Sequence, residues 1–196
     1  MPRLLLIVLL TVLAAPAVAL GRDNPADELV HIPIEASRYD PATHCSSKSR
    51  PGVVKMTTWL EANSRGVFWG SYRCEMWGKK EASLHAENRA IDWHLDHDVR
   101  ADRRAARKLI DLLLATDSAG NAQALARRMG VEELIWDCGY WAAGMAGFVP
   151  YRVCFDRRGE EIRDVDKTVA HRDHVHIGMT KAGAAAKTSF WRRHTG

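Results

Sequence analysis

The chain has 196 residues, of which 27% are charged and 46% hydrophobic, and its formal net charge at pH 7 is +4. This length suits one domain with a hydrophobic core. The basic residues are scattered among acidic ones rather than gathered in a dense stripe, which argues against a nucleic-acid-binding protein.

The first 19 residues have the pattern of a secretory signal peptide. Arg3 precedes an almost wholly apolar stretch, residues 4–13, and Ala17-Val18-Ala19 follows. A basic start, a short apolar segment and an A-x-A site predict cleavage before Leu20; an uncleaved N-terminal anchor is the alternative. No later stretch is long and apolar enough to span a membrane. We therefore expect a secreted or periplasmic protein of the cell envelope, with no membrane segment after cleavage.

The rest of the chain divides into an arm and a domain. Residues 20–44, rich in Pro, Asp and Ser, predict an extended N-terminal arm before a domain over 45–196. Hydrophobic periodicity and end signals predict helices and strands in a mixed order. The predicted helices are 51–63, 101–115 and 122–129, and the predicted strands are 67–76, 89–95, 133–137 and 175–179. The absence of a regular βαβ order indicates an α+β fold with a small, largely antiparallel sheet flanked by helices.

Four cysteines, Cys45, Cys74, Cys138 and Cys154, remain in a chain predicted to be exported. None forms a C-x-x-C pair, so disulfides are favoured over a second zinc site. Three connectivities can be drawn. We favour the pairing of neighbours in sequence, Cys45 with Cys74 and Cys138 with Cys154; reduced thiols are the alternative.

Two histidine-containing segments, residues 83–92 and 171–176, carry the chemistry. They read S-L-H-A-E-N-R-A-I-D and H-R-D-H-V-H. Alternation in the second segment places His174 and His176 on one side of a strand. Together the segments offer a His, an Asp and a His to one tetrahedral zinc ion. Three protein ligands with a fourth position open are typical of a catalytic zinc site.

The pattern S-x-H-x-x-G-x-A-x-D followed by D-x-x-H resembles the signature of D-alanyl-D-alanine metallopeptidases. Those enzymes share a zinc superfamily with lysostaphin-type and Hedgehog-type domains. The wider context, residues 70–74, 84–86 and 170–176, most resembles the bacterial extensin-like C-terminal domain of that superfamily. The resemblance covers about residues 45–178 and implies a Hedgehog/D-Ala-D-Ala metallopeptidase-like fold.

The resemblance also implies roles for individual residues. His85, Asp92 and His176 match the three zinc ligands. Asp173 matches the carboxylate that acts as general base on water. His174 matches the first histidine of the H-x-H pair, which stabilises the oxyanion or is itself the base.

Two further positions follow from the same resemblance. Ser83 matches the serine beside the first ligand. Arg73 is the candidate for the arginine that binds a substrate carboxylate or the oxyanion, and Arg89 is the second choice. The chain departs from the family pattern in having Asn88 in place of a glycine and its arginine before Cys74 rather than after it.

Other polar and aromatic side chains could join the site or have a structural place only. His94 and His97 could form a second metal site with neighbouring aspartates, or be solvated residues at a strand end. His171 is a loop histidine that could orient the base. The aromatic residues Trp136, Tyr140 and Trp141 could line a substrate groove or fill the core. The carboxylates Glu132 and Glu133 could replace Asp173 as the base.

The sequence therefore predicts an exported zinc metallopeptidase that hydrolyses peptide bonds of peptidoglycan, of the D-alanine type. The alternative is a non-catalytic cell-wall binding module that keeps the fold and the metal, an interpretation supported by Asn88 and the displaced arginine. A third is a structural wall protein that has no metal and is held by its disulfides.

Overall fold

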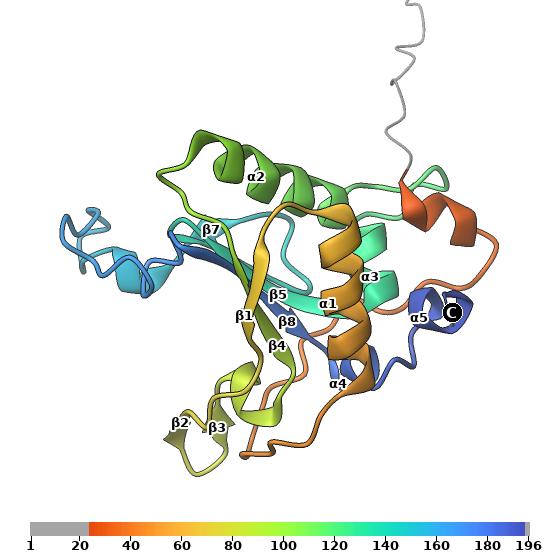
Figure 1. The fold of residues 1–196 in the computed structure, drawn as a ribbon, viewed down its shortest axis with the longest axis horizontal. Coiled ribbons are helices and arrows are strands. Elements are labelled where there is room, and N and C mark those ends of the chain that lie inside the picture. Colours follow the sequence, from red (N-terminus) through yellow and green to blue (C-terminus); the bar gives the residue numbers. More distant parts are fainter. Residues whose placement is uncertain (1–23, 195–196) are drawn as a thin grey trace, which may run out of the picture.

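The computed structural model describes residues 24–194, so the predicted signal peptide, residues 1–19, lies outside them. Within this part of the chain, six antiparallel strands form one sheet in the order β1-β4-β8-β5-β6-β7, and β2 and β3 form a separate hairpin (Figure 1). The predicted α+β fold with a largely antiparallel sheet is confirmed. The strands are β1 (Val67–Gly70), β2 (Met76–Gly78), β3 (Glu81–Ala82), β4 (Ala90–His94), β5 (Val131–Trp136), β6 (Gly139–Ala142), β7 (Val149–Pro150) and β8 (His174–Met179).

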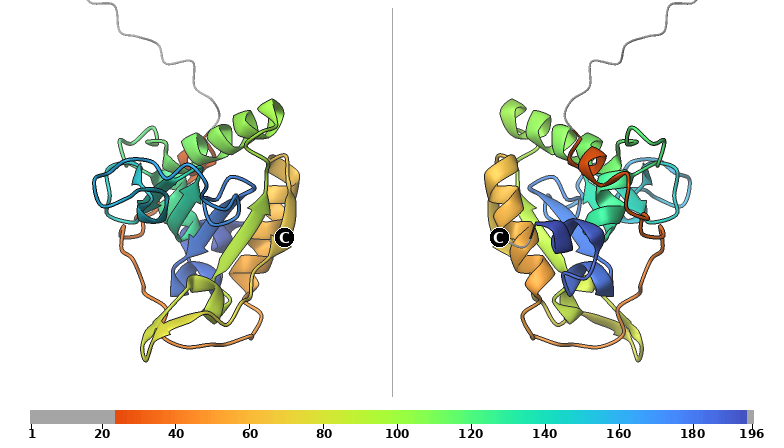
Figure 2. Two further views of the ribbon diagram at one scale, coloured as in Figure 1. Left: turned by 90° about the vertical axis from the view of Figure 1, so that its left-hand side faces the viewer. Right: turned by 90° about the vertical axis from the view of Figure 1, so that its right-hand side faces the viewer.

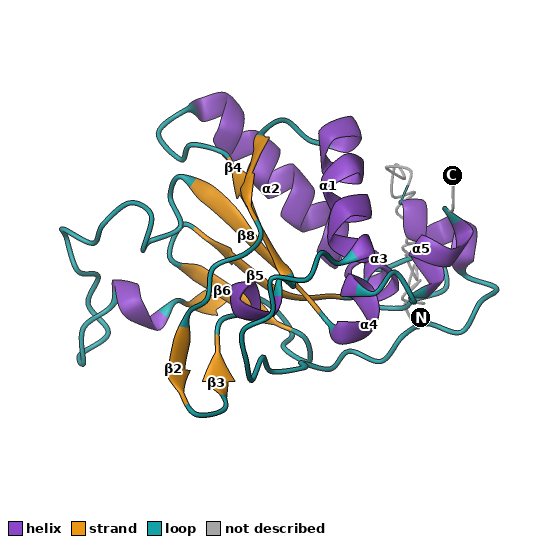
Figure 3. Cartoon of the chain, turned by 60° about the horizontal axis from the view of Figure 1, so that its bottom comes forward, coloured by secondary structure: helices purple, strands orange, loops and turns teal. Residues whose placement is uncertain are grey.

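The helices gather against one face of this sheet and enclose the core. Fully buried Ile91, Trp93, Leu134, Val175 and Ile177 project from β4, β5 and β8 into one cluster with the apolar sides of the helices. Figure 3 shows the larger helices on the side of the sheet away from the β2–β3 hairpin. Because side chains alternate along a strand, the residues between these apolar ones emerge on the opposite face. The α-helices are α1 (Pro51–Asn63), α2 (Arg100–Leu114), α3 (Ala124–Met129), α4 (Lys181–Ala184) and α5 (Ser189–Arg193), with 3₁₀ turns η1 (Pro25–Leu29), η2 (Leu84–Glu87) and η3 (Arg152–Cys154).

The helix predictions agree closely with the structure. Helix α1 has the predicted bounds, with Pro51 in its first turn. Helices α2 and α3 differ from prediction by one or two residues, and α3 ends at Gly130, whose φ of 74° is the left-handed conformation that glycine adopts readily.

The prediction of one continuous strand over 67–76 is wrong. Strand β1 ends at Gly70, and the chain leaves the sheet before the short hairpin strand β2. The backbone between them is used elsewhere: the Ser71 carbonyl lies 3.0 Å from His85 Nδ1, and the Arg73 N–H donates to the His85 carbonyl. Cys74 is bonded to Cys45. These contacts take the place of the hydrogen bonds to a neighbouring strand that a longer β1 would need.

The N-terminal arm is only partly extended, which corrects the prediction for residues 20–44. Its described part begins with η1, whose Ala26 and Leu29 are fully buried in the main core. From there the chain runs down the outside of the domain before α1 begins (Figure 2). It is fastened by backbone N–H groups: Asp40 donates to Glu132 Oε2 at 2.5 Å and Thr43 donates to Glu87 Oε1 at 2.8 Å.

Both predicted disulfides are present, Cys45–Cys74 and Cys138–Cys154. The first joins the arm to the segment after β1, and the second joins the β5–β6 turn to η3. Disulfides persist in oxidising compartments, so they fit an extracellular location. Among the described residues, no helix combines the length and apolar character needed to cross a membrane.

Helix α1 packs against α4 closely enough to exclude any side chain at Gly52. A Cβ there would lie 1.9 Å from the Gly183 carbonyl oxygen. Alanine normally favours a helix over glycine by about 1 kcal/mol. We predict the opposite sign for Gly52→Ala, a loss of about 1–3 kcal/mol in the free energy of unfolding, measured with urea. On the same helix, exposed Val54→Ala should change stability by at most about 0.5 kcal/mol; a Gly52→Ala protein as stable as wild type would contradict the close contact.

Candidate metal centre

His85 is held by the 3₁₀ turn η2, just before β4. The Ser83 side chain caps this turn by accepting a hydrogen bond from the His85 N–H at 3.3 Å. Asn88 ends it with a φ of 55°, the left-handed conformation expected of this residue. The His85 ring is 1% exposed, and its Nδ1 lies 3.0 Å from the Ser71 carbonyl. Because a carbonyl only accepts, Nδ1 carries the proton and Nε2 keeps a free lone pair.

Asp92 and His176 face each other across the sheet. They are register partners on antiparallel β4 and β8, as are His94 and His174. Their neighbours along the strands lie in the core, so Asp92 and His176 share the face that the helices leave uncovered. Both are nearly buried, at 7% and 4% exposure.

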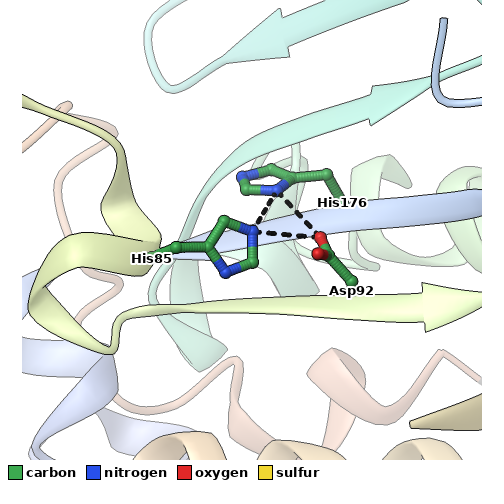
Figure 4. A group of neighbouring side chains, drawn as sticks. All are labelled: His85, Asp92 and His176. Carbon is green, nitrogen blue, oxygen red and sulfur yellow. Dashed lines mark hydrogen bonds and ion pairs between the residues drawn. The ribbon is translucent and has the colours of Figure 1, made fainter. Parts of the chain in front are cut away.

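Three ligand atoms converge between the turn and the two strands (Figure 4). His85 Nε2 lies 3.0 Å from Asp92 Oδ1 and 3.0 Å from His176 Nδ1, and the last two atoms are 3.4 Å apart. In a tetrahedral site with bonds of about 2.0–2.1 Å, two ligand atoms stand roughly 3.3–3.4 Å apart. The three atoms are therefore close to the spacing of one face of a tetrahedron. Within residues 24–194, this is the one group of His, Cys, Asp and Glu side chains that could hold a metal ion.

The electrostatics of the group resemble those of a cation site. Burial alone would raise the pKa of Asp92, but the hydrogen bonds and charges of His176 and His85 hold it far below its usual value. Burial, with the nearby His176, lowers the pKa of His85. Burial would also lower the pKa of His176, but Asp92 and Glu133 outweigh it and raise that pKa to about 9. A carboxylate ionised at every ordinary pH, with two imidazoles against it, suits a divalent cation.

His174 and Asp173 form a pair beside this group. His174 Nδ1 lies 2.7 Å from Asp173 Oδ1, and its Nε2 lies 3.4 Å from Asp92 Oδ1. The other oxygen of Asp173 accepts from the Thr168 hydroxyl. His174 thus stands between Asp173 and the three ligand atoms, and its Nε2 is the nitrogen that faces them.

Arg73 reaches the site, whereas Arg89 does not. Arg73 Nη1 donates to Asp92 Oδ2 at 2.9 Å, and its side chain is 55% exposed. Arg89 is buried, paired with Glu87 and Glu132 at 2.9 and 2.7 Å. Arg89 is therefore part of the interior and is unable to contact a substrate; the second choice for the substrate arginine is wrong.

Of the remaining histidines, His171 comes nearest to the group. Its ring centroid lies 4.6 Å from that of His174 and 5.8 Å from that of His176. Burial, with His176 and His174 nearby, lowers the pKa of His171 to about 2, so the ring is neutral. His94 stacks on Trp69, with ring centroids 4.2 Å apart, and His97 pairs with Asp137 at 3.1 Å. Within the described part of the chain, neither belongs to the group that could hold a metal ion.

The aromatic and acidic candidates divide into residues of the interior and residues on the face that carries the site. Trp136 and Trp141 lie in the core. Glu132 is fully buried beside Arg89, and burial raises its pKa to about 7. Glu133, which the sequence suggested only as a replacement base, instead lies 3.1 Å from His176 Nε2. Tyr140 donates to Glu133 at 3.2 Å. Side chains alternate along a strand and Leu134 points into the core. This alternation is the sequence signal that could have placed Glu133 on the face that carries the site.

No family model, no curated protein and no solved structure matches this chain.

We predict that the protein binds about one divalent metal ion per chain. His85→Ala and His176→Ala should each abolish stoichiometric binding, because two ligands hold a divalent ion far more weakly than three. Elemental analysis after gel filtration measures this, with exposed His31→Ala as the matched control. A wild-type protein that retains no ion after incubation with zinc or cobalt would show that the group is not a metal site.

Proposed function

We propose that this protein is an exported zinc hydrolase that cleaves peptide bonds of cell-wall peptidoglycan, of the D-alanine type. The observation that carries the proposal is the convergence of His85, Asp92 and His176, with His174 directed at the same point. The resemblance of both segments to D-alanyl-D-alanine metallopeptidases supplies the substrate class. Two disulfides fit the oxidising environment in which such an enzyme works.

Zinc suits the donor set better than a harder cation. Two imidazole nitrogens and one carboxylate oxygen are typical zinc ligands, whereas calcium and magnesium take oxygen ligands almost exclusively. When bound, zinc supplies polarisation of a carbonyl group and activation of water at neutral pH.

The chain's own contribution to the reaction is a proton acceptor at His174. Its Nδ1 donates to Asp173, so Nε2 carries the lone pair that faces the site. Nε2 accepts a proton from the attacking water and returns it to the leaving amine. Asp173 keeps the ring oriented and stabilises the imidazolium form. The resemblance implied Asp173 as the general base; we instead propose His174 as the base, one of the two roles that the resemblance allows for it, with Asp173 as its positioning residue.

Arg73 is suited to hold the substrate. Nη1 donates to Asp92 and Nε donates to Glu75 Oε2 at 3.4 Å, and the remaining N–H groups of the half-exposed guanidinium are further donors. A planar guanidinium binds carboxylates with two parallel hydrogen bonds. This matches the terminal carboxylate of a stem peptide or the oxyanion that forms at the scissile carbonyl.

The test is hydrolysis of defined peptidoglycan stem peptides, followed by mass spectrometry. We expect His174→Ala to lower kcat/KM by roughly 10²–10⁴-fold while the protein keeps its zinc. Asp173→Asn should also lower the rate with zinc retained, because the amide can favour the wrong tautomer of His174. His31→Ala serves as the control, and a chelator should remove the activity until zinc is restored.

The same experiment separates the alternatives. Full zinc occupancy without release of product from any fragment would favour the binding module. Correct folding without zinc would favour the disulfide-held structural protein. Asn88 gives little support to a blocked site, because its amide nitrogen donates to the Ser47 and Lys48 carbonyls.

A further inference from the structure

Glu133 lies behind His176, on the side of the ring away from the other two ligands. It projects from β5, next to β8, with its Oε1 3.1 Å from His176 Nε2. His176 Nδ1, at the other edge of the ring, faces His85 and Asp92. The ring therefore stands between Glu133 and the three ligand atoms, so Glu133 is unable to join them.

Gly178 provides the space for this contact. It follows His176 on the same face of β8 and pairs with Glu133 across the strands. A Cβ at position 178 would lie 2.9 Å from the Glu133 Cβ, 2.3 Å from Leu84 Cδ1 and 3.6 Å from His176 Nε2. Gly178 is the small residue on this face of β8, and its lack of a side chain leaves room for Glu133 beside the His176 ring.

A tyrosine holds the carboxylate from the other side. Tyr140 on β6 donates its hydroxyl to Glu133 Oε2 at 3.2 Å. Tyr39, from the N-terminal arm, is near enough to interact electrostatically with the same carboxylate.

The contact is close but not a fully aligned hydrogen bond. His176 Nε2 is buried and has no partner of full hydrogen-bond geometry. Carboxylates in this position are common partners of metal-binding histidines, because they set the tautomer and the orientation of the ring.

We propose that Glu133 is a positioning residue of the metal site, which holds the His176 ring with Nδ1 toward the metal, and that Tyr140 holds Glu133 in turn. The proposal rests on the metal site and not on hydrolysis.

The decisive measurement is zinc affinity by competition with a chromogenic chelator at one fixed pH. We expect Glu133→Gln to weaken zinc binding by about 10- to 100-fold. Glu61→Gln, on the exposed side of α1, is the matched control and should bind zinc as wild type does. In the cobalt-loaded protein, the visible absorption bands of Glu133→Gln should shift, because the His176 ring is no longer held in one orientation.

Tyr140→Phe provides a milder test if Glu133→Gln folds poorly. It removes the hydroxyl that donates to Glu133 and should weaken zinc binding by about 2- to 10-fold. Thermal unfolding of the metal-free proteins is recorded alongside. A lower melting temperature with unchanged zinc affinity and unchanged cobalt spectra would assign Glu133 to structure alone and overturn the proposal.

Two other outcomes are equally clear. A wild-type protein that binds no zinc would overturn this inference together with the metal site. A protein that binds zinc through Glu133-dependent geometry but hydrolyses nothing would refute the enzyme while leaving the inference intact.

Discussion

The pairing of β4 with β8 is the constraint on which the rest of the structure depends. Its register places Asp92 opposite His176 and, on the other face, Ile91 opposite Ile177. A slip by one residue would exchange the faces of one strand, exposing its apolar residues and forcing a histidine or aspartate into the core. Burying such groups without partners costs several kcal/mol. The core therefore enforces the alignment of Asp92 with His176.

The position of His85 depends on a different feature of the chain. His85 precedes β4, so the chain must turn to bring its side chain over that strand. The turn η2 does this within four residues, capped by Ser83 at its start and closed by the left-handed Asn88 at its end. The conformation of Asn88 would cost a β-branched residue more than it costs asparagine. The Cys45–Cys74 bond then secures the segment whose Ser71 carbonyl orients the ring. Local backbone geometry sets this ligand, and sheet register sets the other two.

The sequence predicted the elements that depend on hydrophobic periodicity and local signals. It did not predict the contacts between segments that are distant in the sequence. The alternation over residues 174–179 and the proline at the start of a helix, Pro51, can each be recognised within one short segment. The β5–β6 hairpin was missed because its turn residues, Asp137 and Cys138, have φ of 46° and 57° without the Asn-Gly or Asp-Gly pair that usually marks such a turn. The contact of Glu133 with His176 depends on strand order, which periodicity does not contain. The end of β1 at Gly70 likewise depends on a contact with His85.

Arg89 links the turn to the sheet, although it is not among the residues of the candidate metal centre. It is 1% exposed and bonded on all sides, and a buried ion cluster of this kind adds little net stability because its desolvation is costly. Its partners are more informative, since each lies within three residues of a side chain that belongs to the candidate metal centre or lies near it. They are Glu87 near His85, Glu132 beside Glu133, the Met179 carbonyl after His176, and the Asp40 carbonyl next to Tyr39. One guanidinium with fixed donor directions thus ties together the turn, two strands and the arm. Because these four segments are far apart in sequence, their meeting at Arg89 explains how a small domain keeps the ligands and their supporting residues in one arrangement.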